Sequence, residues 1–469
     1  MIEMMKKPSY SAYRNQQLFS PEDIEHFVDE GSDSESLNDN NFASQKLTGR
    51  TNQNFHHGNN KRWRRLLLVA LLLLVVVLSL LLLLLPQPLS FIRNKTLWLP
   101  GHYNRPTLWF RSDDESENGQ WKFKIVQITD IHLGEAEDTD WGPEQDRKTW
   151  SVIDSVLRKE SPFDLIVLSG DQLTANNCKD NATEYYQLLG EFLTPYNVPW
   201  AMIFGNHDDA DYEVPGTDRK VPTKTDRRRL LKVDASFPLS LSKEGPSYVK
   251  GITNYVLDVL VNDGEDGIDE KDDDTTTTNN NNNNNDGSKR VGAQIFFLDS
   301  GGGALSQTID TSHLEWVRTQ ASVLPTVPAV AFQHIPTSEY VYSGGDVCQG
   351  YQGEGIAPLD YDAGILQTLA NSSKRFLFLA VGHNHGNDYC CPYNPNTSAT
   401  SSWNNHELEV CFGRHSGYGG YGNWERGSRV YELTLGKHSD SSSSSSSWWI
   451  EWKSWVRLES GEVIDEITR

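Results

Sequence analysis

The sequence has few basic residues for its length. Its 469 residues include 42 lysines and arginines but 64 aspartates and glutamates, so the formal charge at pH 7 is −22. Proteins that bind nucleic acid need clusters of basic side chains to neutralise the phosphates, and this balance therefore argues against a nucleic-acid partner. Any phosphate-bearing ligand would need bound cations that reverse the sign of the charge locally.

Cysteine is scarce as well. Only five occur in the chain, and they are Cys178, Cys348, Cys390, Cys391 and Cys411. An oxidising compartment would allow disulfides, although the pairing cannot be read from the sequence. We expect the adjacent Cys390 and Cys391 to pair with distant partners rather than with each other, which leaves one cysteine over.

The sequence contains a single long apolar run. Leu66–Leu85 is apolar throughout except at Ser79, and about 20 helical residues span about 30 Å, the thickness of a bilayer core. The run is too long, and lies too far from Met1, for a cleaved signal peptide. Basic residues directly before the run place its N-terminal side in the cytoplasm. These residues are Lys61, Arg62, Arg64 and Arg65. We therefore predict a single-pass type II membrane protein.

Acceptor motifs for N-linked glycans agree with this orientation. They all follow the apolar run, at Asn94, Asn181, Asn371 and Asn396. The C-terminal region is therefore expected to be lumenal or extracellular, in the secretory pathway, the vacuole or the plasma membrane.

Composition divides the chain into four parts. Residues 1–65 are polar and predict a disordered cytoplasmic tail, residues 66–85 the membrane helix, residues 86–120 a stalk, and residues 121–469 one folded domain. Two low-complexity tracts, at 262–289 and 441–447, are expected to be inserts in loops, where added length costs little entropy.

Short apolar runs rich in β-branched residues recur after Trp121, and each predicts a strand. Segments with a helical pattern lie between several of them, as at Arg147–Lys159 and Glu184–Leu193. Strands that alternate with helices indicate a layered α/β fold. The runs are FKIVQITD, DLIVLSGD, WAMIFGNHD, YVLDVL, AQIFFLDS, AVAFQHIP and RFLFLAVGHNH.

Potential metal ligands follow several of these predicted strands. In open α/β folds ligands bind beyond the carboxyl ends of the strands, so side chains far apart in sequence could converge there. Carboxylates, imidazoles and one amide oxygen suit Zn, Mn or Fe, and two such metals would leave positions open for water and phosphate. The candidates are Asp130, His132, Asp171, Asn206, His207, Asp208, His334, His383 and His385.

The order D-x-H, G-D, G-N-H-D, H, G-H-x-H resembles that of the calcineurin-like metallophosphoesterase superfamily, over roughly Trp121 to Tyr431. SGDQLT, FLDSGGG, QHIPTSEY and GRHSGYGGYG are similar to a short branch of purple-acid-phosphatase relatives of plants and fungi. The resemblance implies a four-layer α/β sandwich, in which two β-sheets pack face to face between helices. It also implies a hydroxide that bridges two metals and attacks a phosphoric ester.

The resemblance assigns a role to each candidate. The first metal would be held by Asp130, His132 and His385, the second by Asn206, His334 and His383, and Asp171 would bridge both. His207 would bind phosphate or protonate the leaving group, and Asp208 would orient His207. One position departs from the purple acid phosphatases, because Thr174 replaces a tyrosine ligand that favours ferric iron. The sequence therefore does not decide whether the two metals are Zn, Mn or Fe.

The sequence thus predicts a membrane-tethered, metal-dependent phosphatase. The resemblance favours phosphoric monoesters as substrates. One alternative is a phosphodiesterase that acts on nucleotides or lipid head groups. Another is a membrane-anchored binding protein of the same fold without turnover. The oligomeric state cannot be read from the sequence.

Overall fold

The computed structural model describes nine stretches of the chain: residues 105–113, 119–178, 181–214, 216–222, 226–262, 289–340, 348–393, 408–438 and 447–469. The predicted tail, the apolar run 66–85 and most of both low-complexity tracts lie outside these residues. Among the described helices, none combines the length and the hydropathy that crossing a bilayer requires.

Two seven-stranded sheets form the centre of the folded part. The first has the order β1 (Leu108–Trp109), β8 (Tyr255–Asn262), β9 (Lys289–Leu298), β11 (Ala329–Gln333), β13 (Phe376–Val381), β15 (Glu409–Phe412) and β14 (Cys390–Pro392). The second has the order β18 (Val463–Thr468), β17 (Ser447–Leu458), β16 (Gly427–His438), β3 (Gln120–Ile128), β4 (Leu165–Ser169) and β5 (Trp200–Ile203), and β2 (Arg111–Asp113) pairs with β3.

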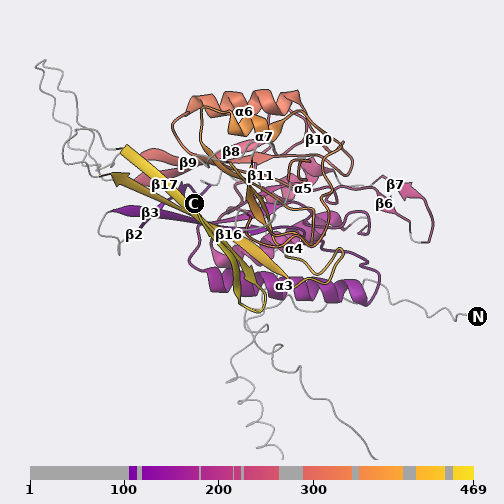
Figure 1. Ribbon diagram of the computed structural model, residues 1–469. Coiled ribbons are helices and arrows are strands. Elements are labelled where there is room, and N and C mark those ends of the chain that lie inside the picture. The colour runs from indigo at the N-terminus through magenta and orange to yellow at the C-terminus, as the bar shows by residue number, and fades with distance from the viewer. Residues whose placement is uncertain are drawn as a thin grey trace, which may run out of the picture. The chain divides into compact units, whose positions relative to one another are not determined.

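Helices cover the outer face of each sheet (Figure 1). Those on the second sheet are α3 (Trp141–Glu160), α4 (Ala182–Leu193) and α5 (Arg227–Asp234), and those on the first are α6 (Thr311–Val323) and α7 (Ile365–Ala370). The remaining elements are a 3-10 turn, η2 (Thr194–Tyr196), and two small ribbons, β6 (Tyr212–Glu213) with β7 (Lys220–Val221) and β10 (Thr308–Ile309) with β12 (Tyr361–Asp362).

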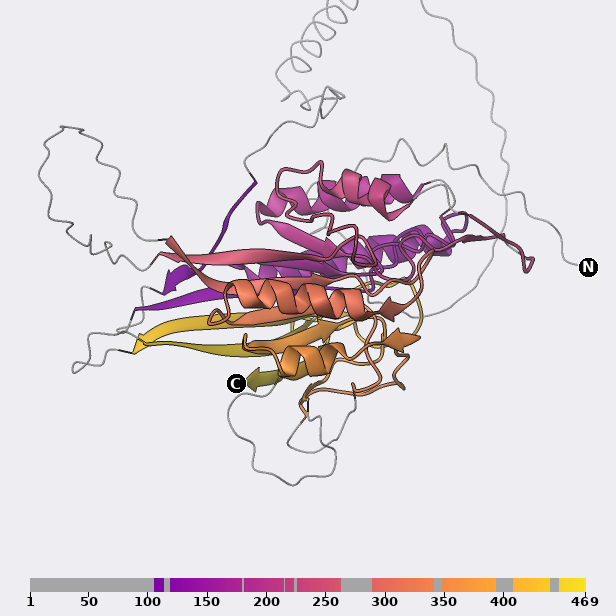
Figure 2. The same ribbon diagram turned by 90° about the horizontal axis from the view of Figure 1, so that it is seen from above.

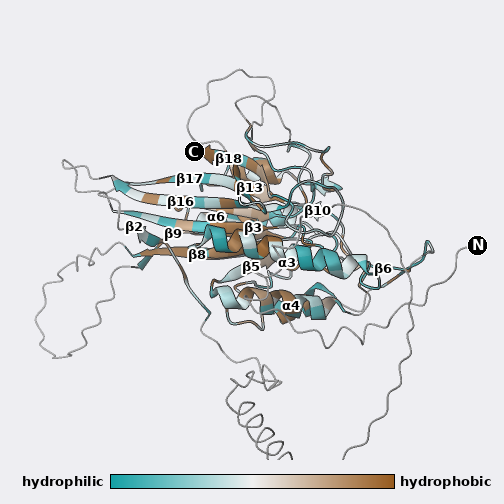
Figure 3. Cartoon of the chain, turned by 90° about the horizontal axis from the view of Figure 1, so that it is seen from below, coloured by the Kyte–Doolittle hydropathy of each residue, from teal (hydrophilic) through white to brown (hydrophobic). Residues whose placement is uncertain are grey.

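The layers follow from the alternation of side chains along each strand. In β4, Leu165 and Val167 join the core between the sheets, while Ile166 and Leu168 pack toward α3 and α4. Figure 1 shows the strands between two sets of helices, Figure 2 shows α6 and α7 lying over the strands, and Figure 3 shows the hydrophobic colours concentrated on the strands. The predicted layered α/β fold with two packed sheets is confirmed.

The predicted stalk, residues 86–120, is wrong at its C-terminal end. Leu108 pairs with Val259 as part of β1, and β2 pairs with the start of β3. Leu108 and Phe110 are buried in the core between the sheets, with only 4% and 5% of their surface exposed. The fold therefore begins before Trp121, because these apolar side chains gain free energy by leaving water.

Parallel pairing sets the position of the candidate residues. β3, β4 and β5 are parallel neighbours in one sheet, and β9, β11 and β13 are parallel neighbours in the other. The carboxyl ends of parallel strands lie at one edge of their sheet, so the loops that follow them come together.

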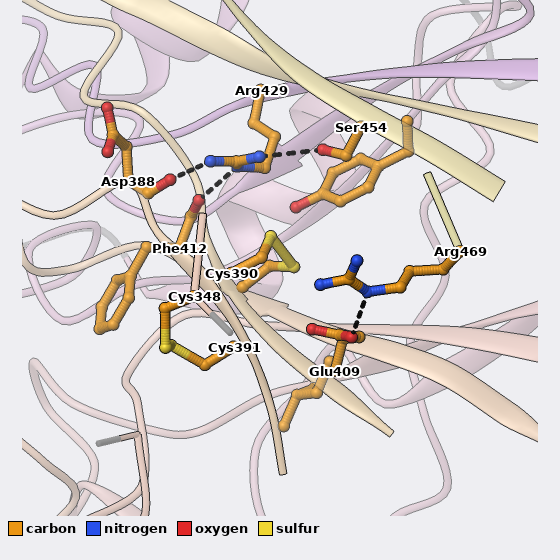
Figure 4. Close-up of a disulfide and its surroundings, with 12 residues drawn as sticks. Cys348, Asp388, Cys390, Cys391, Glu409, Phe412, Arg429, Ser454 and Arg469 are labelled. Atoms are coloured by element: carbon orange, nitrogen blue, oxygen red, sulfur yellow. Dashed lines mark hydrogen bonds and ion pairs between the residues drawn. A yellow bond between two sulfur atoms is a disulfide. The ribbon is translucent and has the colours of Figure 1, made fainter. Parts of the chain in front are cut away.

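Two disulfides lie at the β14–β15 edge (Figure 4). Cys390 pairs with Cys411 directly across the two strands, and Cys391 pairs with Cys348. The buried guanidinium of Arg429 lies close by and donates to the carbonyl oxygens of Phe412 and Asp388. The expectation that the adjacent cysteines take distant partners is confirmed, and Cys178 is the cysteine left over.

Candidate metal centre

Each predicted ligand follows a strand of one of the two sheets. Asp130 and His132 follow β3, Asp171 follows β4 and Asn206 follows β5, while the later histidines follow β11 and β13. The structure brings these side chains together in two groups. The ligand atoms within each group lie within 4.8 Å of one another, and the groups are Asp130, His132 and His385, and Asp171, His334 and His383.

Asp171 lies between the two groups. Its Oδ2 is 3.1 Å from Nε2 of His334 in one group and 3.8 Å from Nε2 of His132 in the other. Within the first group, Nε2 of His132 is 3.1 Å from Nε2 of His385. Oδ1 of Asn206 is 3.2 Å from Nε2 of His334, which adds the amide oxygen to the second group. This arrangement offers donor atoms to two cations that share one carboxylate.

Three imidazoles are oriented by a partner on the far side of the ring. Nδ1 of His334 lies 2.9 Å from the carbonyl oxygen of Ser169, and Nδ1 of His385 lies 3.1 Å from that of Tyr421. A carbonyl oxygen can only accept, so Nδ1 donates to it, and Nε2 would face a cation after losing any proton of its own, as at His334. Nδ1 of His132 is 3.0 Å from the hydroxyl of Thr174. Thr174 therefore contacts a ligand-bearing ring rather than the centre itself.

The backbone at the centre is strained. Asp130, His132, Asp171 and His383 have φ values of 55°, 53°, 53° and 72°, in the left-handed region that non-glycine residues rarely adopt. Such conformations cost on the order of 1–3 kcal/mol each and collect at functional sites. Here the strain directs ligand atoms from separate loops toward one point.

Burial holds most of the imidazoles neutral. It lowers the pKa of His383 to about 3 and that of His385 to about 4, and it lowers the pKa of His132 well below its ordinary value. Burial also opposes the charged form of His334, but the Asp171 carboxylate outweighs it and raises the pKa of His334 to about 9. A cation that binds at His334 would therefore release a proton.

The predicted role of Asp208 is wrong. Its carboxylate does not orient His207 but accepts from the backbone N–H groups of Asp171, Gln172, Leu173 and Gly205 and from the hydroxyl of Tyr186. Asp208 thereby ties the loop after β4 to the loop after β5. His207 instead places Nδ1 at 3.1 Å from Oδ1 of Asn176, and its backbone N–H donates to Asp171 at 2.7 Å.

Sequence reasoning missed two buried side chains. Arg227 donates to Asp209 and Asp299 and to the carbonyl oxygen of Gly205, next to Asn206. His415 is fully buried, and its ring centroid lies 3.9 Å from that of His385. His415 belongs to the GRHSGYGGYG motif, so this histidine could have been found from the sequence. Nothing in the sequence near Arg227 indicated its partners.

Comparison with known proteins agrees with this geometry. The family profile described as "Calcineurin-like phosphoesterase" matches residues 123–385, more than half of the chain. The chain belongs to this family. A site for two metal ions is typical of calcineurin-like phosphoesterases, and both candidate groups here fit that pattern.

Relatives within the family carry different names. A protein of Arabidopsis thaliana named "Probable inactive purple acid phosphatase 28" is 26% identical over 349 residues, which cover 68% of this chain and 77% of that protein. "Phosphatase DCR2" of Saccharomyces cerevisiae is 26% identical over 355 residues, which cover 69% of this chain and 53% of that protein.

A purple acid phosphatase from yellow lupin, Lupinus luteus, is a similar solved structure, with a TM-score of 0.40 and 14% identity. The match covers 74% of this chain and 53% of the lupin chain. This chain therefore matches about half of the length of the yeast relative and of the lupin protein.

Proposed function

We propose that the protein is a metal-dependent phosphatase that hydrolyses phosphoric monoesters. The observation that carries the proposal is the convergence of two ligand groups that share the Asp171 carboxylate. The first metal would be held by Asp130, His132 and His385, and the second by His334, His383 and Asn206. Bound metals would supply positive charge for the phosphoryl oxygens and a water of lowered pKa.

His207 would act on the substrate. Its Nδ1 is occupied by Asn176, which leaves Nε2 to bind a phosphoryl oxygen or to give a proton to the leaving group. The ring centroid of His207 lies 5.0 Å from that of His132, so His207 lies beside the first ligand group. The hydrogen bond from its backbone N–H to Asp171 fixes this position relative to the shared carboxylate.

The neutral imidazoles support this reading. A ring that stays unprotonated at pH 7 can donate a lone pair to a cation, and burial produces that state at His132, His383 and His385. The donor set of carboxylate, imidazole and amide suits Zn, Mn or Fe, and the metal identity remains open.

Hydrolysis of two esters by the full-length protein tests the proposal. The chain is loaded separately with Zn, Mn or Fe and assayed on p-nitrophenyl phosphate and bis-p-nitrophenyl phosphate, with metal content measured on the same samples. Faster release from the monoester supports a monoesterase, and faster release from the diester supports a phosphodiesterase.

A binding protein without turnover is the second candidate, because the Arabidopsis relative is named as inactive. A folded, metal-loaded sample that releases nitrophenol from neither ester would sink the enzyme proposal and favour this candidate. Metal content separates the two cases from a simple failure to load the site.

We also propose that residues 66–85 tether the protein to a membrane, with the catalytic part in the secretory lumen or outside the cell. The basic flank of the apolar run and the two disulfides support this topology. Glycosidase treatment of the full-length protein from its native membranes tests it. An unchanged electrophoretic mobility would count against the lumenal placement.

A further inference from the structure

Four side chains lie beside the candidate metal centre, close to Gly386, the residue after the ligand His385. They are Tyr351, Glu354, Tyr421 and Trp424, and we call them the aromatic patch. Glu354 accepts from the backbone N–H of Gly386 at 2.8 Å. The indole of Trp424 packs on Gly386 so closely that a Cβ there would lie 2.6 Å from it.

The aromatic patch is continuous with the ligands. The ring of Tyr421 stacks on that of His385 with a centroid distance of 4.1 Å and an interplanar angle of 11°. Trp424 meets Tyr421 edge to face at 6.4 Å. Gly353 fits between the ring of Tyr351 and the indole, because a Cβ there would lie within 2.9 Å of both. A group bound at the centre would therefore have aromatic surface next to it.

Part of this aromatic surface faces solvent. Tyr351 is 56% exposed and Tyr421 is 49% exposed. Tyrosine and tryptophan side chains are enriched where one end of the ring packs on a partner and the other meets water. Their exposure at the edge of a candidate active site is therefore consistent with a surface that receives a ligand.

Among its four side chains the aromatic patch has one charge, the carboxylate of Glu354, while the buried guanidinium of Arg426 donates to the carbonyl oxygen of Trp424. Glu354 accepts from the hydroxyl of Tyr421 at 2.8 and 2.9 Å and from Gly386, and all of these donors are neutral. Within the described part of the chain, no lysine, arginine or histidine lies at ion-pair distance from Glu354. A second carboxylate, Glu135, accepts from Gly420 on the other side of the same turn. Carboxylates in this position would repel a polyanionic leaving group.

Exposed aromatic rings beside a carboxylate that has no cationic partner among the described residues are the chemistry that recognises alkylammonium ions. Resting on the phosphatase function proposed above, we propose that the aromatic patch binds the leaving group of the substrate. The preferred substrates would be phosphomonoesters of alcohols that carry a quaternary or primary ammonium group. Glu354 would supply the charge contact, and Tyr421 and Trp424 the cation–π contacts.

A pair of isosteric esters tests this inference on the full-length, metal-loaded protein. Phosphocholine carries the cation, and 3,3-dimethylbutyl phosphate has the same shape without the charge. We expect kcat/KM to be about tenfold higher for phosphocholine, since one cation–π or charge contact in a partly desolvated site is worth about that much. Glu354→Gln should bring the ratio toward one, whereas Glu244→Gln, an exposed control distant in sequence, should leave it unchanged.

The ratio of kcat/KM for phosphocholine to kcat/KM for 3,3-dimethylbutyl phosphate tests the ammonium subsite separately from the phosphatase function. Turnover of p-nitrophenyl phosphate with a wild-type ratio near one would overturn the subsite and leave the phosphatase standing. Absence of any turnover would overturn both. Equal losses on the two esters in Glu354→Gln, with the ratio kept, would show that Glu354 only holds the loop of His385 and would also overturn the subsite.

Discussion

Thr174 occupies the position at which the purple acid phosphatases have a tyrosine ligand, and its hydroxyl lies 3.0 Å from Nδ1 of His132. A partner of this kind fixes the tautomer and the direction of a metal-binding ring. Thr174→Val keeps the shape but removes the acceptor. We expect metal affinity to fall about 10- to 100-fold, as measured by competition with a chelator.

Thr174→Ser is the matched control for this prediction, because it keeps the hydroxyl, and it should bind metal nearly as tightly as the wild type. Urea unfolding of both variants shows whether the fold is intact. A valine variant with wild-type affinity would mean that His132 is oriented by its other neighbours alone.

Asp171 lies between the two ligand groups, and its replacement tests whether they act as one centre. Asp171→Asn removes the negative charge and one strong donor while keeping the size. We expect elemental analysis to find less metal per chain, and turnover to fall at least about 100-fold because the metals supply the nucleophile. Asp360→Asn, at an exposed position, is the control. Full metal content in Asp171→Asn would contradict the shared role.

At the scale of elements, α6 has a well-formed N-terminus. Asp310 accepts from the backbone N–H of Ser312 at 2.9 Å and pairs with Lys250 at 3.0 Å. Burial opposes its charge, but these donors outweigh burial and hold the pKa of Asp310 below its ordinary value. A carboxylate with a depressed folded pKa stabilises the fold fully above its unfolded pKa of about 4, and this contribution is lost as the pH falls below it.

Asp310→Ala should therefore lower the free energy of unfolding by about 1 kcal/mol at pH 7, which is the usual value of a helix cap. The difference from wild type should shrink when urea unfolding is repeated at pH 3. A difference that stays the same at both pH values would mean that the charge of Asp310 contributes nothing.

The first two strands give another prediction at this scale. A chain that begins at residue 121 lacks β1 and β2 and leaves the space of Leu108 and Phe110 empty. Burying each of these side chains is worth about 1.5–3 kcal/mol, so the loss should be about 3–6 kcal/mol relative to a chain that begins at residue 105. Chemical denaturation of the two chains measures the difference, and equal stability would restore the stalk interpretation.

Sequence reasoning found the strongly apolar strands, but it missed the two shortest strands at the start of the fold and also β16 and β17, which have twelve residues each. β13 is apolar over all six residues, and β3, β4 and β9 are rich in apolar and β-branched residues, so their composition marks them as strands. β1 has two residues and β2 three, too few for any periodicity. α3 begins at Trp141, before the predicted Arg147, because an exposed tryptophan, a glycine and a proline conceal its first turn.

The candidate site also has residues whose role the sequence could predict and residues whose role it could not. The ligands could be predicted because each stands directly after a strand, where the chemistry of the residue and the topology agree. Asp208 could not, since its partners are backbone N–H groups from two separate loops, and only the folded chain shows which carboxylate receives them. Contacts of this kind depend on how loops approach one another rather than on a local pattern.

At the scale of the whole molecule, the cysteines give a simple count. All five lie in the described part of the chain, and two disulfides leave only Cys178 reduced. Burial raises the pKa of the Cys178 thiol and shields it from reagents. We expect a thiol reagent to find no reactive group in the native, unreduced protein and one per chain after unfolding in denaturant.

Reduction before unfolding should free the four disulfide cysteines, which gives five thiols with Cys178, and should lower the free energy of unfolding by about 2–5 kcal/mol, because the unfolded chain regains freedom. Cys178→Ser is the control and should abolish the single thiol without changing the effect of reduction. More than one thiol in the unreduced, unfolded chain would contradict one of the disulfides.

The left-handed backbone of Asp130, His132, Asp171 and His383 has a consequence for how the protein acquires its metals. Backbone hydrogen bonds from Asp130 to Gly170 and from His132 to Asp171 hold these loops, so we predict that the receptor for the ions forms without them. Filling it becomes an ordinary equilibrium with the surrounding pool, separate from folding. Chelation and reloading should then be reversible in the intact protein. The occupants would follow supply, so the same polypeptide from two different cells would carry different metals.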